Sequence, residues 1–476
     1  MKPIYLTNTL SKQKETFQSI IPGSVSMYHC GPTVYWTQHI GNMRAMTITD
    51  LAHRMFLYNG YNVKLVRNYT DVGHLTGDNI GDADTGEDRM EKAAKRENIT
   101  PEEIADKYIK IFNDDIASLN TIPPAHATRA TDYISDMIAM VQDLLDKGFA
   151  YVTPHAVYFD VKKFPNYTQL SGQKLDHLEA GEGHGSVGDS DKHNAHDFAL
   201  WFFKAGAHAN ALQTWNSPFP SPLVENGRGF PGWHIECSAM SKHHLGPTFD
   251  IHLGGVEHIP IHHTNEIAQS ECANGVHFVN YWLHNEHLLV DNKKMAKSEG
   301  TSYTLDDIRK KGFDPIDLRY FFLQSNYRSK QNFTWEGLEA SKTALGKLKT
   351  LVSRTKEIGK ISESYKTLFT DMVNDDLNTA GGLAVVWELI KNPDVLDVDK
   401  KATILDFDRV LGLKLDEVPT NEEVFDIPEH VQKLLKEREI AREKQDWHTS
   451  DLIRNEIQAL GYELKDTDDG QKVRKV

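Results

Sequence analysis

Cysteine is scarce in this 476-residue chain, and long apolar runs are missing from it. Three cysteines cannot form a disulfide scaffold, so any that matter are expected to be thiols or metal ligands. No stretch approaches the ~18 consecutive apolar residues that a membrane helix needs. The start, MKPIYLTNTLSKQKE, lacks the apolar core of a secretory signal. The sequence therefore predicts a soluble, cytoplasmic protein.

An excess of positive charge is also absent. The chain has 53 lysines and arginines against 68 aspartates and glutamates, a formal net charge of −15. The basic character typical of nucleic-acid-binding proteins is therefore missing from the chain as a whole. An RNA partner would have to bind local basic patches on an acidic body. At ~150 residues per domain, the length predicts about three folding units.

The clearest structural pattern lies in residues 24–72. Segment 24–30, SVSMYHC, is rich in strand formers, and apolar residues recur at helical spacing from Gly41 to Asn59-Gly60. Residues 61–69, YNVKLVRNY, again indicate a strand. This order predicts a βαβ unit, and hence a parallel sheet with a ligand crevice at the carboxyl ends of its strands. Cys30 and the segment 39–42 fall in that crevice.

The rest of the chain divides by pattern. Helical periodicity covers 101–119 and 131–148, and an irregular stretch at 151–230 interrupts the sheet as an insertion. A second α/β segment covers 233–282. After about residue 302 the pattern is almost entirely helical, with a last linker at 416–428.

Histidine is abundant and clustered, in contrast to cysteine. Four of the 23 histidines gather near Glu266, namely His252, His258, His262 and His263. His262 and Glu266 are four residues apart and would share one face of a helix. With Cys30 and Cys237 they make a set of two thiolates, an imidazole and a carboxylate, which suits tetrahedral zinc.

Two other interpretations of this set stay open from the residues alone. The thiols could be buried apolar side chains beside a solvated histidine loop, or a zinc ion with four protein ligands could be purely structural. An HExxH motif is absent, which argues against a zinc peptidase of that type.

Residues 39–42, HIGN, lie between a predicted strand and a helix start. Backbone N–H groups and the helix dipole favour an anion there. His39 and Asn42 can donate hydrogen bonds to phosphate oxygens, and Gly41 allows a nucleotide to approach the backbone.

A cationic segment, DNKKMAKSEG, follows about 250 residues later at 291–300. Lys294 and Lys297 could neutralise the charge that develops on a leaving pyrophosphate. Each short motif alone is a weak signal. Their occurrence on opposite sides of an inserted segment is a stronger indication of nucleotide chemistry.

HIGN is similar to the HIGH signature, and KMAKS (294–298) to the KMSKS signature, of class I aminoacyl-tRNA synthetases. Longer segments along nearly the whole chain resemble the cysteinyl-tRNA synthetase family, namely CGPTVY (30–35), NYTDV (68–72), GWHIECSAM (232–240), FDIHLGG (249–255), HHTNEIAQSE (262–271), NYWLH (280–284), YFFLQSNYRSKQNFTWEGL (320–338), NDDLNTAGGL (374–383) and AREKQDWHTSDLIRNEIQALGYEL (441–464).

The resemblance implies an α/β fold: a split Rossmann-type parallel-sheet catalytic domain with an inserted domain, then a C-terminal helical bundle and a small α/β tail. The expected domains are the first half of the Rossmann domain (1–125), a connective insertion (126–228), the second half with the zinc ligands (229–285), a stem-contact connector with KMAKS (286–330), a helical bundle (331–415) and an anticodon-binding domain (420–476).

It also implies the reaction. The family activates L-cysteine with ATP to cysteinyl-adenylate and transfers it to the 3′ end of tRNA(Cys), with Mg²⁺ accompanying ATP. One Zn²⁺ per chain at positions matching Cys30, Cys237, His262 and Glu266 would bind the substrate thiolate. Neither DNA nor a membrane is expected as a partner.

Further roles follow from the same resemblance. Catalysis is assigned to His39, Asn42, Lys294 and Lys297, and ATP binding to these residues with Gly41 and Ser298. Substrate binding is assigned to Trp233, His252, Thr33 and Thr70. Anticodon reading is assigned to the terminal helix with Arg438, Arg442, Lys444 and Trp447, for which a solvated face is the alternative. Cys272 is expected to be a core thiol.

Two departures from the signatures keep alternatives open. Asn42 replaces the second histidine of HIGH and cannot carry charge, and Ala296 replaces the central serine of KMSKS. One alternative is therefore a catalytically impaired paralogue that binds RNA or zinc. Another is the cysteine ligase of mycothiol synthesis, which lacks a helical region like residues 330–476.

Overall fold

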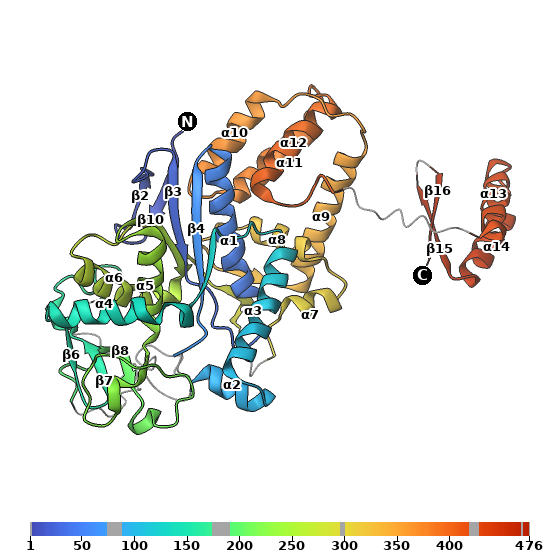
Figure 1. The fold of residues 1–476 in the computed structure, drawn as a ribbon. Coiled ribbons are helices and arrows are strands. Elements are labelled where there is room, and N and C mark those ends of the chain that lie inside the picture. Colours follow the sequence, from blue (N-terminus) through green and yellow to red (C-terminus); the bar gives the residue numbers. More distant parts are fainter. Residues whose placement is uncertain are drawn as a thin grey trace. The chain divides into compact units, whose positions relative to one another are not determined.

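The computed structural model describes residues 2–73, 88–173, 191–295, 300–417, 428–467 and 470–475. The chain forms two compact units, with the division between Asp416 and Glu417 (Figure 1). Within the described ranges, every helix is too short or too polar to cross a lipid bilayer.

Five parallel strands form the central sheet of the first unit, in the order β11-β10-β3-β4-β5. Their bounds, in that order, are Val279–Asn285, Phe249–Gly255, Ser24–His29, Asn62–Tyr69 and His126–Arg129. Helix α1 (Ile40–Tyr58) connects β3 to β4, which confirms the predicted βαβ unit. The sheet is split in sequence, because β10 pairs with β3 only after the insertion.

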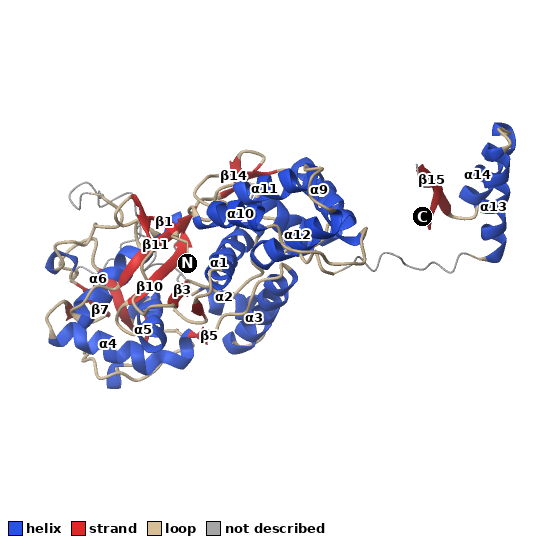
Figure 2. Ribbon diagram, turned by 90° about the horizontal axis from the view of Figure 1, so that it is seen from above, coloured by secondary structure: helices blue, strands red, loops and turns tan. Residues whose placement is uncertain are grey.

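Helices cover both faces of this sheet (Figure 2). One face packs on α4 (Ile134–Asp146), α5 (Trp233–Leu245) and α6 (His262–Asn274), and the other packs on α1. The alternation of side chains along a strand explains this division. On β3, Tyr28 belongs to the core beside α4–α6, whereas its neighbour Met27 belongs to the core beside α1.

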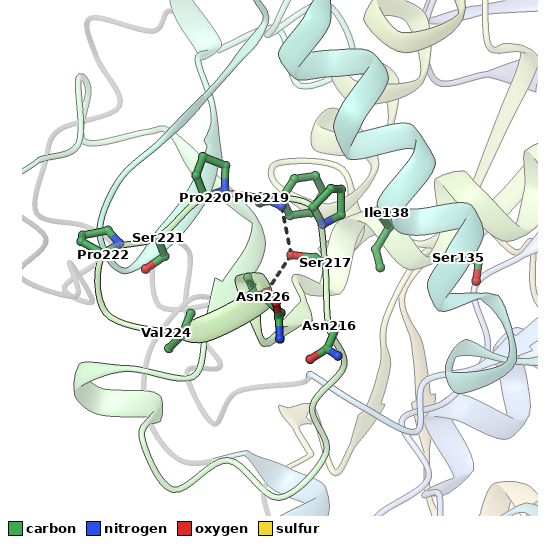
Figure 3. Close-up of a pocket in the computed structure, with 12 residues that line it drawn as sticks. Ser135, Ile138, Asn216, Ser217, Phe219, Pro220, Ser221, Pro222, Val224 and Asn226 are labelled. Atoms are coloured by element: carbon green, nitrogen blue, oxygen red, sulfur yellow. Dashed lines mark hydrogen bonds between the residues drawn. The ribbon is translucent and has the colours of Figure 1, made fainter.

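The insertion builds an antiparallel sheet of its own, in the order β6-β7-β8-β9. Its strands are Ala150–Val152, Ala156–Phe159, Phe198–Phe203 and Gly229–Pro231. All six residues of β8, FALWFF, are buried. A pocket of about 1030 Å³ opens between α4 and the loop at 216–227 (Figure 3), and none of the predicted site residues lines it.

A connector follows β11 and carries the KMAKS segment. Three short strands pair in the order β13-β12-β14, with bounds Lys293–Lys294, Leu288–Val290 and Gln331–Phe333. The remaining elements of the first unit are β1 (Tyr5–Asn8), β2 (Gln13–Thr16), α2 (Arg89–Glu97), α3 (Pro101–Ser118), α7 (Leu305–Lys310), α8 (Pro315–Leu323), α9 (Trp335–Ser353), α10 (Glu363–Asn374), α11 (Thr379–Lys391) and α12 (Asp397–Leu411).

The second unit contains α13 (Glu429–Glu443), α14 (Trp447–Ala459) and a hairpin of β15 (Tyr462–Thr467) and β16 (Gly470–Lys475). The terminal helix predicted to continue through Trp447 is two helices, because Gln445 adopts a left-handed φ of 58°. Arg438 is buried and donates to Gln471 Oε1 at 2.8 Å, so it does not belong to a solvated face. Trp447, in contrast, is 59% exposed.

Candidate functional site

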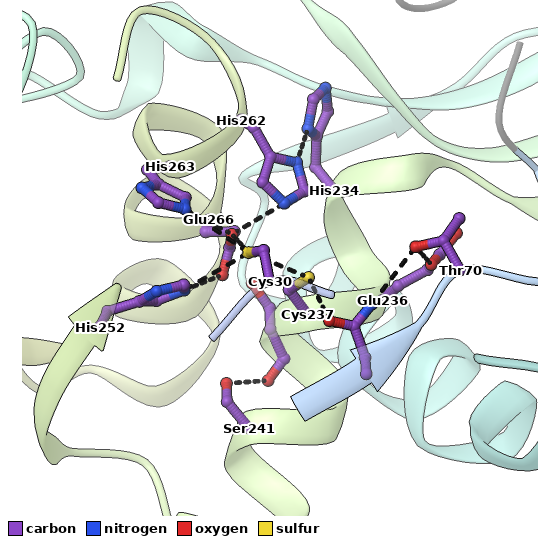
Figure 4. Close-up of polar contacts among 12 residues, drawn as sticks. Cys30, Thr70, His234, Glu236, Cys237, Ser241, His252, His262, His263 and Glu266 are labelled. Atoms are coloured by element: carbon purple, nitrogen blue, oxygen red, sulfur yellow. Dashed lines mark hydrogen bonds and ion pairs between the residues drawn. The ribbon is translucent and has the colours of Figure 1, made fainter. Parts of the chain in front are cut away.

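Two thiols, imidazoles and a carboxylate converge at the carboxyl end of β3 (Figure 4). Cys30 follows β3 directly, Cys237 lies on α5, and His262 and Glu266 lie on α6. Cys30 Sγ lies 3.5 Å from both Cys237 Sγ and Glu266 Oε1, and Glu266 Oε1 lies 3.0 Å from His262 Nε2. All four side chains are buried, so the solvated histidine loop considered above does not form at His262.

The local fold explains why these side chains meet. His262 and Glu266 occupy the first two turns of α6, four residues apart, and therefore point the same way. Cys237 lies in the second turn of α5, and α5 and α6 pack side by side over the sheet. Asn68 at the end of β4 steadies the Cys30 end, because its Oδ1 accepts from the backbone N–H of Gly31 at 2.8 Å.

Two more histidines border the same carboxylate. His252 Nε2 on β10 lies 3.0 Å from Glu266 Oε2, and its ring stacks on Trp282. His263 Nε2 lies 3.5 Å from Cys30 Sγ, while its Nδ1 lies 2.7 Å from His284 Nε2. Cys30, His252, His263 and Glu266 thus form a second group of donors that shares two members with the first.

The electrostatics favour ionised ligands in part of this cluster. Burial opposes the charge on Glu266, but the imidazoles of His252 and His262 outweigh it and hold the pKa of this carboxyl well below its usual range. Burial also opposes ionisation of Cys237, yet the Cys30 hydrogen bond and His262 lower its pKa to about 6. Burial and the neighbouring Cys237 raise the pKa of Cys30. The directions of these two shifts favour Cys237 over Cys30 as the ionised thiol of the pair.

The first group has the chemistry and spacing of a zinc site. Its four ligand atoms lie within 4.8 Å of one another. A tetrahedron with metal–ligand bonds of 2.0–2.3 Å has edges of about 3.3–3.8 Å, close to the separations found here. Burial opposes the charge on His262, but Glu266 and Cys237 outweigh it and raise its pKa to about 10, so Nε2 must lose its proton to bind a metal. Two sulfur ligands favour zinc over harder divalent ions.

The predicted substrate residues lie at different distances from this cluster. Trp233, at the start of α5, stacks on His262 with ring centroids 4.3 Å apart. Thr70 is buried, and its hydroxyl donates to Glu236 Oε2 at 2.8 Å, so this hydrogen is already used within the protein. Thr33 pairs with Thr70 through an isolated parallel bridge.

The HIGN segment forms the start of α1. His39 is the N-cap, and its Nδ1 accepts from the backbone N–H groups of Gly41 and Asn42 at 3.1 and 3.3 Å. The His39 side chain thus caps the helix through these two N–H groups. Because Nδ1 accepts, the neutral ring carries its proton on Nε2, which can donate to a phosphate oxygen.

The KMAKS segment starts beside HIGN. Lys294 is exposed on β13, and a Cβ placed on Gly41 would lie 2.4 Å from Met295 Cε. On the far side of the loop, Tyr303 O accepts from the backbone N–H of Ile40 at 2.8 Å. Lys297 and Ser298, together with Ala296, lie outside the described residues.

Sequence reasoning placed His263 near Glu266 without giving it a role, and it did not identify Glu236 or Arg44. Glu236 is the neighbour of a predicted ligand, and only the EC dipeptide could have indicated it. Arg44, two residues after HIGN, is 1% exposed. An arginine among the apolar residues that follow HIGN was the available signal.

Comparisons with known proteins agree with these motifs. Residues 16–343 match the family described as "tRNA synthetases class I (C) catalytic domain", and residues 425–474 match "Cysteinyl-tRNA ligase anticodon binding domain". Cysteine–tRNA ligase 1 of Burkholderia lata is 42% identical over 472 residues, covering 99% of this chain and 97% of its own. Cysteine–tRNA ligase of Thermus thermophilus is 38% identical over 493 residues, covering 99% of each.

A solved structure supports the fold at lower similarity. The methionyl-tRNA synthetase of Mycobacterium tuberculosis, bound to methionyl-adenylate, superposes with a TM-score of 0.54 at 12% identity. The match covers 82% of this chain and 90% of that one.

Proposed function

Since the chain belongs to the cysteinyl-tRNA synthetase family of class I aminoacyl-tRNA synthetases, we propose that four of its side chains hold one zinc ion, namely Cys30, Cys237, His262 and Glu266. The chain is a cysteine–tRNA ligase: it activates L-cysteine with ATP and joins it to tRNA(Cys). We infer that it acts in the cytoplasm, where tRNA is charged. The convergence of four buried donors within 4.8 Å at a strand end carries the zinc proposal.

Bound zinc would supply a soft Lewis acid that favours the thiolate of cysteine over the hydroxyl of serine. The chain's own residues shape the pocket around it. Trp233 stacks on His262 and fixes that ring, and His252 is held by Glu266 and Trp282. Both rings would border the substrate side chain, and discrimination against serine needs no separate editing site.

The ATP end of the site is assigned to HIGN and KMAKS. His39 would donate from Nε2, and Asn42 from its side-chain amide, to phosphate oxygens. Lys294 and Lys297 would neutralise the charge of the phosphates, Ser298 would donate a hydrogen bond to a phosphate oxygen, and Mg²⁺ would accompany ATP. The contact of Met295 with Gly41 supports this assignment, since it brings the two motifs together in one place.

The chemistry needs little beyond this placement. A carboxylate oxygen of cysteine attacks the α-phosphorus of ATP, and the bond to the β-phosphate oxygen breaks to release pyrophosphate. A ribose hydroxyl of the terminal adenosine of tRNA then attacks the carbonyl and AMP leaves with the bonding electron pair. Positioning and charge stabilisation account for the protein's contribution to both steps.

The alternatives are separated by specific features. The match of residues 425–474 to an anticodon-binding domain disfavours a mycothiol-type ligase. Asn42 and Ala296 are the only grounds for an impaired paralogue. ATP–pyrophosphate exchange across the twenty amino acids tests for the impaired paralogue, and charging of tRNA(Cys) then separates the synthetase from a mycothiol-type ligase. Exchange with cysteine alone supports the proposal, and no exchange with zinc-loaded protein would favour the impaired paralogue.

The zinc ligands are tested by Cys237→Ser. We expect loss of stoichiometric zinc and a fall in cysteine-dependent exchange of at least about 10³-fold, because a serine hydroxyl does not ionise to serve as a ligand. Metal content is measured on the purified protein, together with the thiolate charge-transfer absorption of the cobalt-substituted form. Cys272→Ser is the matched control, since Cys272 belongs to neither group of donors. Normal zinc and normal exchange in Cys237→Ser would contradict the assignment.

A further inference from the structure

Arg44 is a buried cation with no catalytic assignment. It lies on α1, two residues after Asn42, and is 1% exposed. Burial lowers its pKa to about 10, so it stays protonated at neutral pH. A buried guanidinium is unfavourable unless its donors are satisfied. Its hydrogen-bond partners therefore show what it does.

Those partners all lie in the connector that carries Lys294. Arg44 Nε donates to Gln331 Oε1 at 3.1 Å, and Nη1 donates to Glu286 O. Nη2 reaches three further main-chain oxygens, those of Asn326 at 3.3 Å, Tyr327 at 3.4 Å and Ser329 at 3.0 Å. One side chain of the HIGN helix thus holds two separate stretches of the connector.

These two stretches lead into the strands beside Lys294. Glu286 precedes β12 and Gln331 opens β14, and the two strands pair in parallel. β12 also pairs with β13, where Leu289 lies opposite Lys294. Arg44 therefore holds the chain at the first residue of β14 and two residues before β12, and through these two strands it bears on the position of Lys294 relative to α1.

We propose that Arg44 is a positioning residue for cysteine activation, which fixes Lys294 relative to His39 and Asn42. This inference rests on the proposed ATP site. α1 also contacts the connector through apolar packing, through the backbone hydrogen bond of Ile40 to Tyr303, and through the ion pair of Asp50 with Arg319. Arg44 adds the hydrogen bonds that hold the connector on both sides of Lys294 in the sequence, at Glu286 and at Gln331.

The guanidinium is suited to this role in a way that lysine is not. Its planar fork presents donors in several directions at once, and here they reach Glu286 and Gln331 from opposite edges. A lysine ammonium is a single point with three donors, and it cannot reach both stretches together. Arg44→Lys keeps the charge and removes the bridge.

The test compares kinetics per active site. For Arg44→Lys in the full chain, we expect the turnover of cysteine-dependent ATP–pyrophosphate exchange to fall about 10- to 100-fold. The KM for cysteine should change less than about twofold and zinc content should not change, because the zinc cluster is not touched. Turnover is normalised by titrating active sites with a single-turnover burst of adenylate, so that unfolded protein does not count.

Arg54→Lys is the matched control. Arg54 lies on the same helix and donates to Asp50 Oδ2, Arg409 O and Asn120 O, outside the stretches that Arg44 holds. It should lose stability yet keep wild-type turnover per active site. Wild-type turnover in Arg44→Lys, or an equal loss in Arg54→Lys, would overturn the proposal.

Gln331→Leu tests the route if Arg44→Lys does not fold. It should lower turnover about 3- to 10-fold, and the double variant should be no slower than Arg44→Lys; losses that multiply would overturn the route. Lys294→Ala separates this inference from the ATP-site assignment. Normal exchange in Lys294→Ala means that the ATP site is wrong, whereas impaired Lys294→Ala with normal Arg44→Lys rejects only the positioning role.

Discussion

Gly41 of HIGN occupies a crowded position. A Cβ on Gly41 would lie 2.4 Å from Met295 Cε and 3.0 Å from two atoms of the His39 ring. Met295 can move aside because only the end of a flexible side chain is involved. The His39 ring cannot move without breaking the hydrogen bonds that cap α1.

Gly41→Ala should therefore reduce activity without unfolding the protein. Alanine favours a helix over glycine by ~1 kcal/mol, which offsets the crowding, so the free energy of unfolding should change by less than about 1 kcal/mol. The KM for ATP should rise at least about tenfold, because a methyl group now stands where the nucleotide approaches the backbone. Steady-state exchange at varied ATP measures this, and an unchanged KM for ATP would remove Gly41 from the nucleotide site.

The Cys–His–Glu cluster shows which contacts of single side chains can be predicted from the sequence. Cys30, Cys237, His262 and Glu266 were predicted as one set, and they lie together. The involvement of His263 and the hydrogen bond of Thr70 to Glu236 were not foreseen. Both depend on which way a side chain turns at a helix start or strand end, and periodicity does not fix this.

Two glycines, Gly412 and Gly275, end their helices in the same backbone conformation. Gly412 ends α12 with φ 65°, and Gly275 ends α6 with φ 71°. Each donates its backbone N–H to the carbonyl four residues earlier, at 2.7 Å. They differ in surroundings: a Cβ on Gly412 would lie 2.6 Å from Arg319 Nη2, whereas a Cβ on Gly275 would meet nothing within 4 Å.

Substitution by alanine should separate backbone strain from crowding. Gly275→Ala should lower the free energy of unfolding by about 1 kcal/mol, the cost of a left-handed conformation. Gly412→Ala should lower it by about 2–4 kcal/mol, because the buried Arg319 must also weaken its hydrogen bonds. Urea unfolding of both variants measures the difference. Equal losses of unfolding free energy would show that Arg319 can move aside without weakening its hydrogen bonds.

How well a helix or strand can be predicted from the sequence depends on what stabilises it. The βαβ unit at 24–69 was foreseen because apolar periodicity and the glycine turns agree there, and β3, α1 and β4 follow it closely. The terminal helix was predicted as continuous because its charged residues continue through Gln445, and a single left-handed residue divides it. Helices stabilised mainly by local charge patterns give little warning of such breaks.

The whole chain separates into two units with independent cores. The second unit is built around Val431, Ile453, Ile457, Tyr462 and Leu464, and among the residues that the structure describes this cluster has members from the second unit only. Removal of the second unit should therefore expose no core of the first. A chain ending at Asp416 should fold by itself.

We expect this 1–416 chain to keep cysteine-dependent ATP–pyrophosphate exchange within about twofold of the full chain. Its charging of tRNA(Cys) should fall by about 10²-fold or more in kcat/KM, because a second binding module is lost. Both reactions are measured on the same preparation. Unchanged charging would contradict the anticodon-binding role, and loss of exchange would show that the two units are not independent.

The strand order of the central sheet determines when its strands can pair during translation. β3 lies between β4 and β10, and Ser26 of β3 bonds Asp250 of β10 across 224 residues of sequence. At ~5–20 residues per second, a ribosome needs roughly 10–45 s to make that interval. Until then β3 presents an unpaired edge, a template for mispairing with other chains. Cys30, at the end of that edge, leaves the ribosome long before the other three members of its set. A metal held by all four could therefore bind only after the insertion has been translated.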